Sequence, residues 1–277
     1  MDIPYLNKND SRMIPNTFEA YGIGRENSSF DFQVGYVDKI KLRNSEDFIP
    51  MGEVLGIENN DSGTSVLGAI WKPESTGFDI GATLQRTPNL FRLFYAETNW
   101  KRTFNGVGLL GSAQYTREES IGDHLLGDFK TDARGLKLIT SYSNVVFSLA
   151  YTRTDDGAKI KSPFGGRPGY TTSMLNDFDR ANEKAWRGSL SFHFDAIGLP
   201  DWSFNASHIR GKDAIEDNSF LPLGNIRETD ITLDYKPEHG RLRGLWFRVR
   251  YARLKEDGEG EVASQVRIIL NYSFNIL

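Results

Sequence analysis

The C-terminal part of the chain alternates apolar and polar side chains, and this alternation constrains the fold more than any other feature. In 245–251 the odd positions are Leu, Phe, Val and Tyr, and in 268–276 the even positions are apolar. Successive side chains of a strand point to opposite faces, so each segment has one apolar and one polar face. Segments of roughly ten residues with many aromatic side chains recur along the chain, which favours strands that cross a membrane as a β-barrel.

Composition agrees with this interpretation and excludes several other classes. No apolar run in the 277 residues is long enough for a transmembrane helix, and aromatic residues make up 12%. The absence of cysteine excludes disulfides, thiolate metal sites and cysteine nucleophiles. The net charge is -4 and basic residues are dispersed among acidic ones, so we expect no nucleic-acid partner and no cofactor.

The alternation predicts an all-β, antiparallel, up-and-down barrel of about thirteen strands in a single domain that spans 1–277. The predicted strands are 17–24, 29–40, 65–73, 77–86, 90–101, 106–118, 132–142, 144–154, 184–195, 201–212, 226–236, 243–254 and 262–276. Strand 90–101 has two competing apolar faces, one with Phe91, Leu93 and Tyr95 and the other with Leu90, Phe94 and Trp100.

Long and short connections alternate along the chain, with 87–89 as the one exception. The long ones are 41–64, 119–131, 155–183 and 213–225. Outer-membrane barrels have short periplasmic turns and longer extracellular loops. With a periplasmic C-terminus all the long loops lie outside, so we predict a multi-pass protein of the bacterial outer membrane.

An odd number of strands is unusual, because bacterial single-chain barrels have an even number. The first strand runs inward from outside, which leaves 1–16 extracellular, and the first residues do not form a signal peptide. We therefore expect an odd number of further strands before this chain. Refolded as written, the chain is expected to give no stable channel, because open sheet edges leave backbone groups unsatisfied in lipid.

Several segments resemble the OprD family of outer-membrane porins. They are 9–21 (NDSRMIPNTFEAY), 163–173 (PFGGRPGYTTS), 177–183 (DFDRANE) and 266–274 (VRIILNYSF). The resemblance implies a monomeric 18-stranded barrel of which these are the last thirteen strands. It also implies that 1–16 and 155–183 are extracellular loops that fold inward and form the constriction.

The resemblance further implies passive, selective diffusion of small carboxylate-bearing solutes, such as amino acids, peptides or organic acids, past basic residues on the pore wall. The alternation itself places these candidates on polar strand faces: Lys137, Arg187, Arg248, Arg250 and Arg267. Facing lipid at mid-bilayer would cost each of them about 2–4 kcal/mol. Alternatively, they only solvate the lumen and pair with wall carboxylates, namely Asp79, Glu118, Asp230 and Asp234.

Loop residues complete the expected solute site. The candidates near the constriction are Arg12, Tyr170, Ser173, Asp177, Asp179 and Arg180. An acidic loop residue opposite a basic wall suits a zwitterion, although the two aspartates could instead make turn hydrogen bonds. Outer-membrane lipid, including lipopolysaccharide, is the other expected partner.

Two alternatives remain open from the sequence. One is a soluble or surface-exposed β-sandwich or barrel that binds through its loops. The other is an outer-membrane hydrolase, but His193 has Ser189, Ser191 and Asp195 only as neighbours along its own strand. A catalytic triad needs groups that converge from different strands, and no Gly-x-Ser-x-Gly motif occurs. We therefore predict no catalytic and no metal-binding residues.

Overall fold

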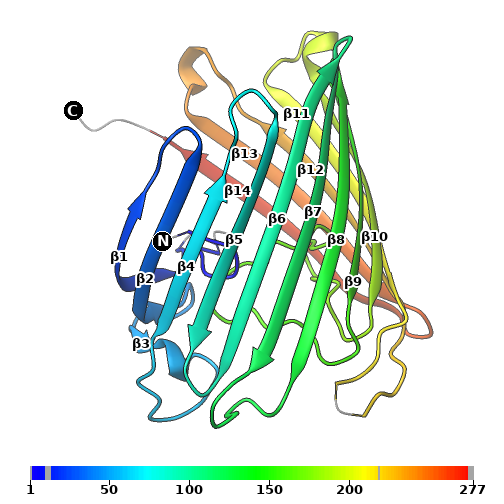
Figure 1. Ribbon diagram of the computed structural model, residues 1–277. Helices are drawn as coiled ribbons and strands as arrows, with labels where there is room; N and C mark the ends of the chain where they lie inside the picture. Colours follow the sequence, from blue (N-terminus) through cyan, green and yellow to red (C-terminus); the bar gives the residue numbers. More distant parts are fainter. Residues whose placement is uncertain (1, 10–13, 218, 274–277) are drawn as a thin grey trace.

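The structure, a computed structural model, describes residues 2–9, 14–217 and 219–273. Its main feature is one antiparallel sheet in which each long strand pairs with its neighbours in sequence. Figure 1 shows the sheet as a curved wall that encloses the N-terminal segment. The strands are β1 (Thr17–Arg25), β2 (Phe30–Lys41), β3 (Ile49–Pro50), β4 (Thr64–Trp71), β5 (Phe78–Thr87), β6 (Phe91–Phe104), β7 (Val107–Ser120), β8 (Lys130–Tyr142), β9 (Val145–Thr154), β10 (Lys184–His193), β11 (Trp202–Lys212), β12 (Ile226–Tyr235), β13 (Leu245–Glu256) and β14 (Gly260–Tyr272).

The all-β, antiparallel prediction is confirmed, and each predicted strand corresponds to a long strand of the sheet. The two-residue β3, which pairs with β2 inside the long loop 42–63, was not predicted. Three short 3₁₀ turns are also present: η1 (Met51–Glu53), η2 (Phe194–Ile197) and η3 (Gly240–Leu242). No helix in the described part of the chain is long and apolar enough to cross a bilayer.

The long loops lie at one end of the sheet, together with the short connections 88–90 and 257–259, and the remaining short connections lie at the other end. A two-residue turn joins β6 to β7 through Asn105 and Gly106, whose φ angles are 48° and 80°. Positive φ at both central residues is typical of a two-residue hairpin turn that matches strand twist. At the opposite end, the loop that joins β9 to β10 is the longest connection between consecutive strands.

The outer face of the sheet is apolar, as the alternation predicts. On β14, Ile268 is 70% exposed and Leu270 is 67% exposed, although both are large aliphatic residues. Their neighbours Arg267 and Ile269 lie on the other face, opposite Arg250 and Arg248 of β13. A water-soluble sandwich would bury these aliphatic side chains, so that alternative is wrong; a lipid-facing belt accounts for them.

Buried apolar residues gather inside the wall at its long-loop end. The larger cluster joins Ile3, Tyr5 and Leu6 of the N-terminal segment to Leu93 of β6 and Phe164 of the loop 155–183. Phe91, Leu93 and Tyr95 therefore face inward, whereas Phe94 is 38% and Trp100 is 42% exposed on the outer face. Leu90, which the prediction grouped with these two, belongs instead to the buried cluster. Strand 90–101 has two apolar faces because one meets lipid and the other is covered by the N-terminal segment.

The sheet has two edges, β1 and β14. Among the described residues no backbone pairing joins these two strands. The eighteen-stranded closed barrel therefore stays a prediction.

Candidate solute pathway

The N-terminal segment lies against the inner wall and is held mainly by apolar burial. Tyr5 is 2% exposed and Leu6 is 0% exposed. The Tyr5 hydroxyl lies 2.8 Å from Oγ1 of Thr116 on β7, and Gln85 Nε2 on β5 donates to the Pro4 carbonyl at 2.6 Å. Burial raises the pKa of Tyr5, so its phenol stays neutral at ordinary pH.

Asn7 ties this segment to the loop 155–183. Its Nδ2 donates to the Gly166 carbonyl at 2.7 Å, and its Oδ1 accepts from the Gly166 N–H at 2.7 Å. A side chain at the preceding Gly165 would place a Cβ 2.6 Å from the Asn7 backbone nitrogen. The close approach of the two loops therefore requires glycine at 165.

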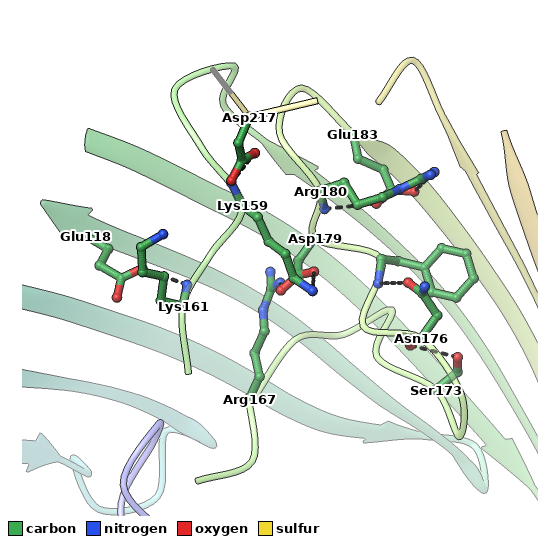
Figure 2. A network of polar contacts seen from close by, with 11 residues as sticks. Glu118, Lys159, Lys161, Arg167, Ser173, Asn176, Asp179, Arg180, Glu183 and Asp217 are labelled. Carbon is green, nitrogen blue, oxygen red and sulfur yellow. Dashed lines mark hydrogen bonds and ion pairs between the residues drawn. The ribbon is translucent and has the colours of Figure 1, made fainter. Parts of the chain in front are cut away.

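The loop 155–183 is fastened by buried ion pairs, which Figure 2 shows from close by. Arg167 pairs with Asp179, and both side chains are 2% exposed. Lys159 reaches the same carboxylate at 3.7 Å. Arg180 pairs with Glu183 at 2.8 Å and donates to the Gly224 carbonyl at 3.0 Å.

Wall carboxylates at the ends of the strands hold the loop's backbone. Glu118 of β7 is fully buried and accepts from the Lys161 N–H at 2.8 Å. On the other side, Glu228 of β12 accepts from the Leu175 N–H at 2.8 Å. The loop is therefore fixed to the wall at two points on different strands, as well as to itself.

A hollow of 560 Å³ opens beneath this loop, and its lining combines loop and wall residues. Lys137 of β8 places its Nζ 4.1 Å from the ring centre of Tyr170. Arg187 of β10 donates to the Thr172 carbonyl at 2.7 Å, and Glu97 of β6 also lines the space. Burial raises the pKa of the Tyr170 phenol above its ordinary value. The hollow therefore offers Lys137 and Arg187, the ion-paired Arg167, one carboxylate and a neutral phenol.

Three further arginines continue along the inner face of β13 and β14. Arg250 and Arg267 are directly opposite in the register. Arg267 donates to the Met174 carbonyl of the loop at 3.3 Å. Arg248 is held by Asp234, with Nε–Oδ1 at 2.6 Å and Nη2–Oδ2 at 3.0 Å. Arg250, by contrast with Arg248, makes no ion pair within the described residues.

The opposite part of the wall is acidic. Asp31, Asp79 and Glu97 line a hollow of 650 Å³ together with Asp2 of the N-terminal segment. Asn99 connects this group to β7, because its Nδ2 donates to Asp79 at 2.9 Å and its Oδ1 accepts from Ser112 at 2.6 Å. Inward-facing basic side chains thus stand on β8, β10, β13 and β14, and inward-facing carboxylates stand on β2, β5, β6 and β12.

The loop candidates fall into different places. Tyr170 reaches the hollow, whereas Asp179 and Arg180 are engaged in the ion pairs that fasten the loop. Ser173 donates to the Asn176 carbonyl at 2.9 Å, and Asp177 is half-buried. Arg12 lies outside the described residues.

Sequence reasoning missed four residues that organise the site. These are Asn7, Glu97, Arg167 and Glu183. Arg167 and Glu183 carried a signal, since they stand in the segments 163–173 and 177–183, whereas Asn7 and Glu97 carried none. Within the described residues no group of His, Asp or Glu side chains could hold a metal ion.

Comparison with known proteins identifies the class. The sequence profile of the family described as "outer membrane porin, OprD family" matches residues 1–276. The chain therefore belongs to the OprD family of outer-membrane porins, which are channels and not enzymes. Membership implies passage of small solutes through a monomeric channel in the Gram-negative outer membrane. No curated protein matched the sequence.

Solved structures share the fold at low sequence identity. Pseudomonas aeruginosa OccK9 (OpdG) superposes with a TM-score of 0.89 at 23% identity, over 98% of this chain and 70% of that one. Pseudomonas aeruginosa OpdK with vanillate superposes with a TM-score of 0.88 at 20% sequence identity, over 98% of this chain and 72% of that one. A BenF-like porin from Pseudomonas fluorescens Pf-5 superposes with a TM-score of 0.86 at 18% sequence identity, over 98% of this chain and 71% of that one.

Proposed function

We propose that the protein mediates passive, selective diffusion of small carboxylate-bearing solutes along the inward-facing basic residues of its lumen. The observation that carries this proposal is the set of inward-facing cations that runs from the hollow to the guanidinium of Arg250. The structure of OpdK with vanillate, an aromatic carboxylate, is consistent with it. The thirteen long strands would form part of an eighteen-stranded barrel that closes beyond β1 and β14.

The basic residues of the inner face contribute to the proposed pathway in different ways, according to their position and their ion pairs. Lys137 and Arg187 stand where the loop narrows the lumen, so they meet the solute first. Arg250 follows on β13 and offers a bidentate fork to a carboxylate. Arg248 is already neutralised by Asp234 and contributes little attraction. Each contact must stay weak, because a solute that binds tightly does not leave.

Glu97 suggests which of the small carboxylate-bearing solutes the channel prefers. It lines the same hollow as Lys137 and Arg187 and hydrogen-bonds to Tyr95. A solute with both a carboxylate and an ammonium group would satisfy both signs of charge.

The remaining loop candidates, Asp177, Ser173 and Arg12, are proposed to contact the solute at the entrance. Outer-leaflet lipid, including lipopolysaccharide, is the proposed neighbour of the outer face.

A pair of solutes with the same shape tests the proposal. Protein isolated from outer membranes is placed in liposomes, and uptake of benzoate is compared with that of benzamide. We expect benzoate to enter faster, and R250Q to lower the ratio about threefold, since one exposed charge contributes less than about 1 kcal/mol. R92Q, which removes an outward-facing arginine, is the control and should leave the ratio unchanged. Equal ratios in the protein and in R250Q would overturn the proposal.

A further inference from the structure

The outer face carries a second set of cations, which the channel function does not use. Just beyond the apolar belt, at the long-loop end, the first outward residue is an arginine on five consecutive strands. These are Arg86, Arg92, Arg117, Arg134 and Arg153 on β5 to β9. Further basic residues continue this level around β10 to β13, namely Lys184, His208, Arg210, Lys212, Arg227, Arg253 and Lys255.

The strand register places many of these like charges directly opposite one another. One row runs Arg134–Arg153–Lys184–Lys212 across four strands. A second runs Arg210–Arg227–Lys255 across three. Like charges opposite each other in a sheet are destabilising, so such rows are expected where an external anion compensates them.

Acidic residues of the protein compensate only some of these cations. Asp213 lies 2.9 Å from Lys184, and Asp257 lies 3.7 Å from Arg227. Among the described residues, Arg153, Arg210, Lys212 and Lys255 form no ion pair. By contrast, Arg92 of β6 and Arg117 of β7, which stand on the same outer face, both pair with Glu119.

The second row, Arg210–Arg227–Lys255, borders a hollow on the outer face of the sheet. A space of 350 Å³ is lined by His208, Arg227, Thr229, Tyr251, Arg253 and Lys255. His208 Nδ1 lies 2.9 Å from Thr229 Oγ1, and Arg253 is held from the far side by Glu261. These contacts fix two sides of the space, while Lys255 and the remaining guanidinium N–H groups are left for a ligand.

Its height on the barrel indicates what kind of ligand it meets. Tyr251 forms the lower edge of the hollow, and Val266, directly across from it, is 61% exposed. Below this level Ile268, opposite Val249, is 70% exposed and continues the apolar outer face. Aromatic girdles mark the membrane interface of barrels. The hollow therefore lies at the level of lipid headgroups and opens toward the bilayer, not toward the lumen.

We propose that this hollow binds a phosphate group of an anionic glycolipid in the outer leaflet. The proposal rests on the outer-membrane orientation of the proposed channel, which puts the long loops outside. Arg227 and Arg253 match phosphate oxygens bidentately, Lys255 adds a third cation, and Thr229 offers a hydroxyl. The acyl chains of the same lipid lie along the apolar belt below, which distinguishes it from a free phosphate ion.

Native mass spectrometry of protein isolated from outer membranes tests this proposal. The probes are bis-phosphorylated lipid A, its dephosphorylated form, and inorganic phosphate as competitor. The variant is R227Q/K255Q, and the matched control is R92Q/R117Q, whose cations lie at the same level but share Glu119. We expect R227Q/K255Q to lower the retained phosphorylated lipid about tenfold and the control to retain it, since two charge-assisted contacts are lost.

Further measurements keep the result unambiguous. K255Q alone should lower retention about threefold if the double variant does not assemble, and R227K, which keeps the charge, should retain most of the lipid. Equal retention in R227Q/K255Q, an equal loss in the control, equal binding of the dephosphorylated lipid, or full competition by inorganic phosphate would each overturn the proposal. Benzoate uptake through R227Q/K255Q should be unchanged, so a failure here is distinguishable from a failure of the proposed solute pathway.

Discussion

The two segments that narrow the lumen are held in opposite ways. Residues 2–9 are fixed by the burial of apolar side chains such as Leu6 against the wall. The loop 155–183 is fixed by buried ion pairs, chiefly Arg167 with Asp179, and by wall carboxylates that accept its backbone N–H groups. Both lie at the same end of the same sheet, and Asn7 joins them.

This difference has a physical consequence. Apolar contacts are non-directional, so the first segment fills space and tolerates small shifts. An ion pair out of water is stable only with good geometry, so the second segment has one well-defined position. The segment that presents Tyr170 to the solute hollow is thus the one whose position is most narrowly defined.

The largest effect is expected from removing one member of the buried ion pair. D179N leaves the Arg167 guanidinium buried without its counter-charge, which destabilises the closed loop by about 3–5 kcal/mol. Hydrogen exchange of the loop amides in the folded protein measures this opening. D177N is the matched control, because Asp177 lies two residues away and is only half-buried. Slow exchange in D179N, equal to that of the unaltered protein, would contradict an ion-paired fastening.

A smaller but still large effect is expected in the apolar segment. Leu6 is 0% exposed, and L6A should destabilise the docking of residues 2–9 by about 2–5 kcal/mol through lost burial and the cavity left behind. The readout is the protection of the amides of 2–9 from exchange, with I14A as the control at a 57% exposed site. If L6A loosened the loop 155–183 more than its own segment, the two would not be held independently.

The sequence predicted the wall well because a strand has a strict period. Inward Arg187 and Arg250, and outward Ile268 and Leu270, follow from alternation alone. The prediction was ambiguous only at 90–101, where both faces are apolar. One face contacts lipid and the other contacts the N-terminal segment, and hydropathy does not distinguish these two surroundings.

The loop interior was not predictable in the same way. Arg167 and Asp179 are twelve residues apart in a segment without periodicity, so nothing local identifies them as partners. The double hydrogen bond of Asn7 to Gly166 joins residues 159 apart in sequence. The two-residue strand β3 is likewise too short for any repeating pattern. Such contacts depend on the tertiary fold rather than on residue type.

The connection between the two segments gives the next prediction. N7A removes both hydrogen bonds to Gly166, with an expected cost of about 1–3 kcal/mol for the partly buried backbone groups left unpaired. N7D keeps the acceptor but loses the donor, so its cost should be intermediate. Combined with D179N in a double-mutant cycle, N7A reports whether the segments open together. Strict additivity of the exchange free energies would show that they open separately.

The smallest effect compares one tyrosine from each segment. Y170L removes the ring beneath Lys137 and should change the benzoate-to-benzamide ratio about two- to fivefold, which corresponds to a cation–π contact of about 0.5–1 kcal/mol. Y170F keeps the ring and should leave the ratio unchanged, as should Y5F in the apolar segment. Burial raises the pKa of both phenols, so they stay neutral and the ratio should not vary between roughly pH 7 and 9. An equal change in Y5F and Y170L would mean that both segments face the solute, and the distinction between a space-filling segment and a solute-contacting loop would fail.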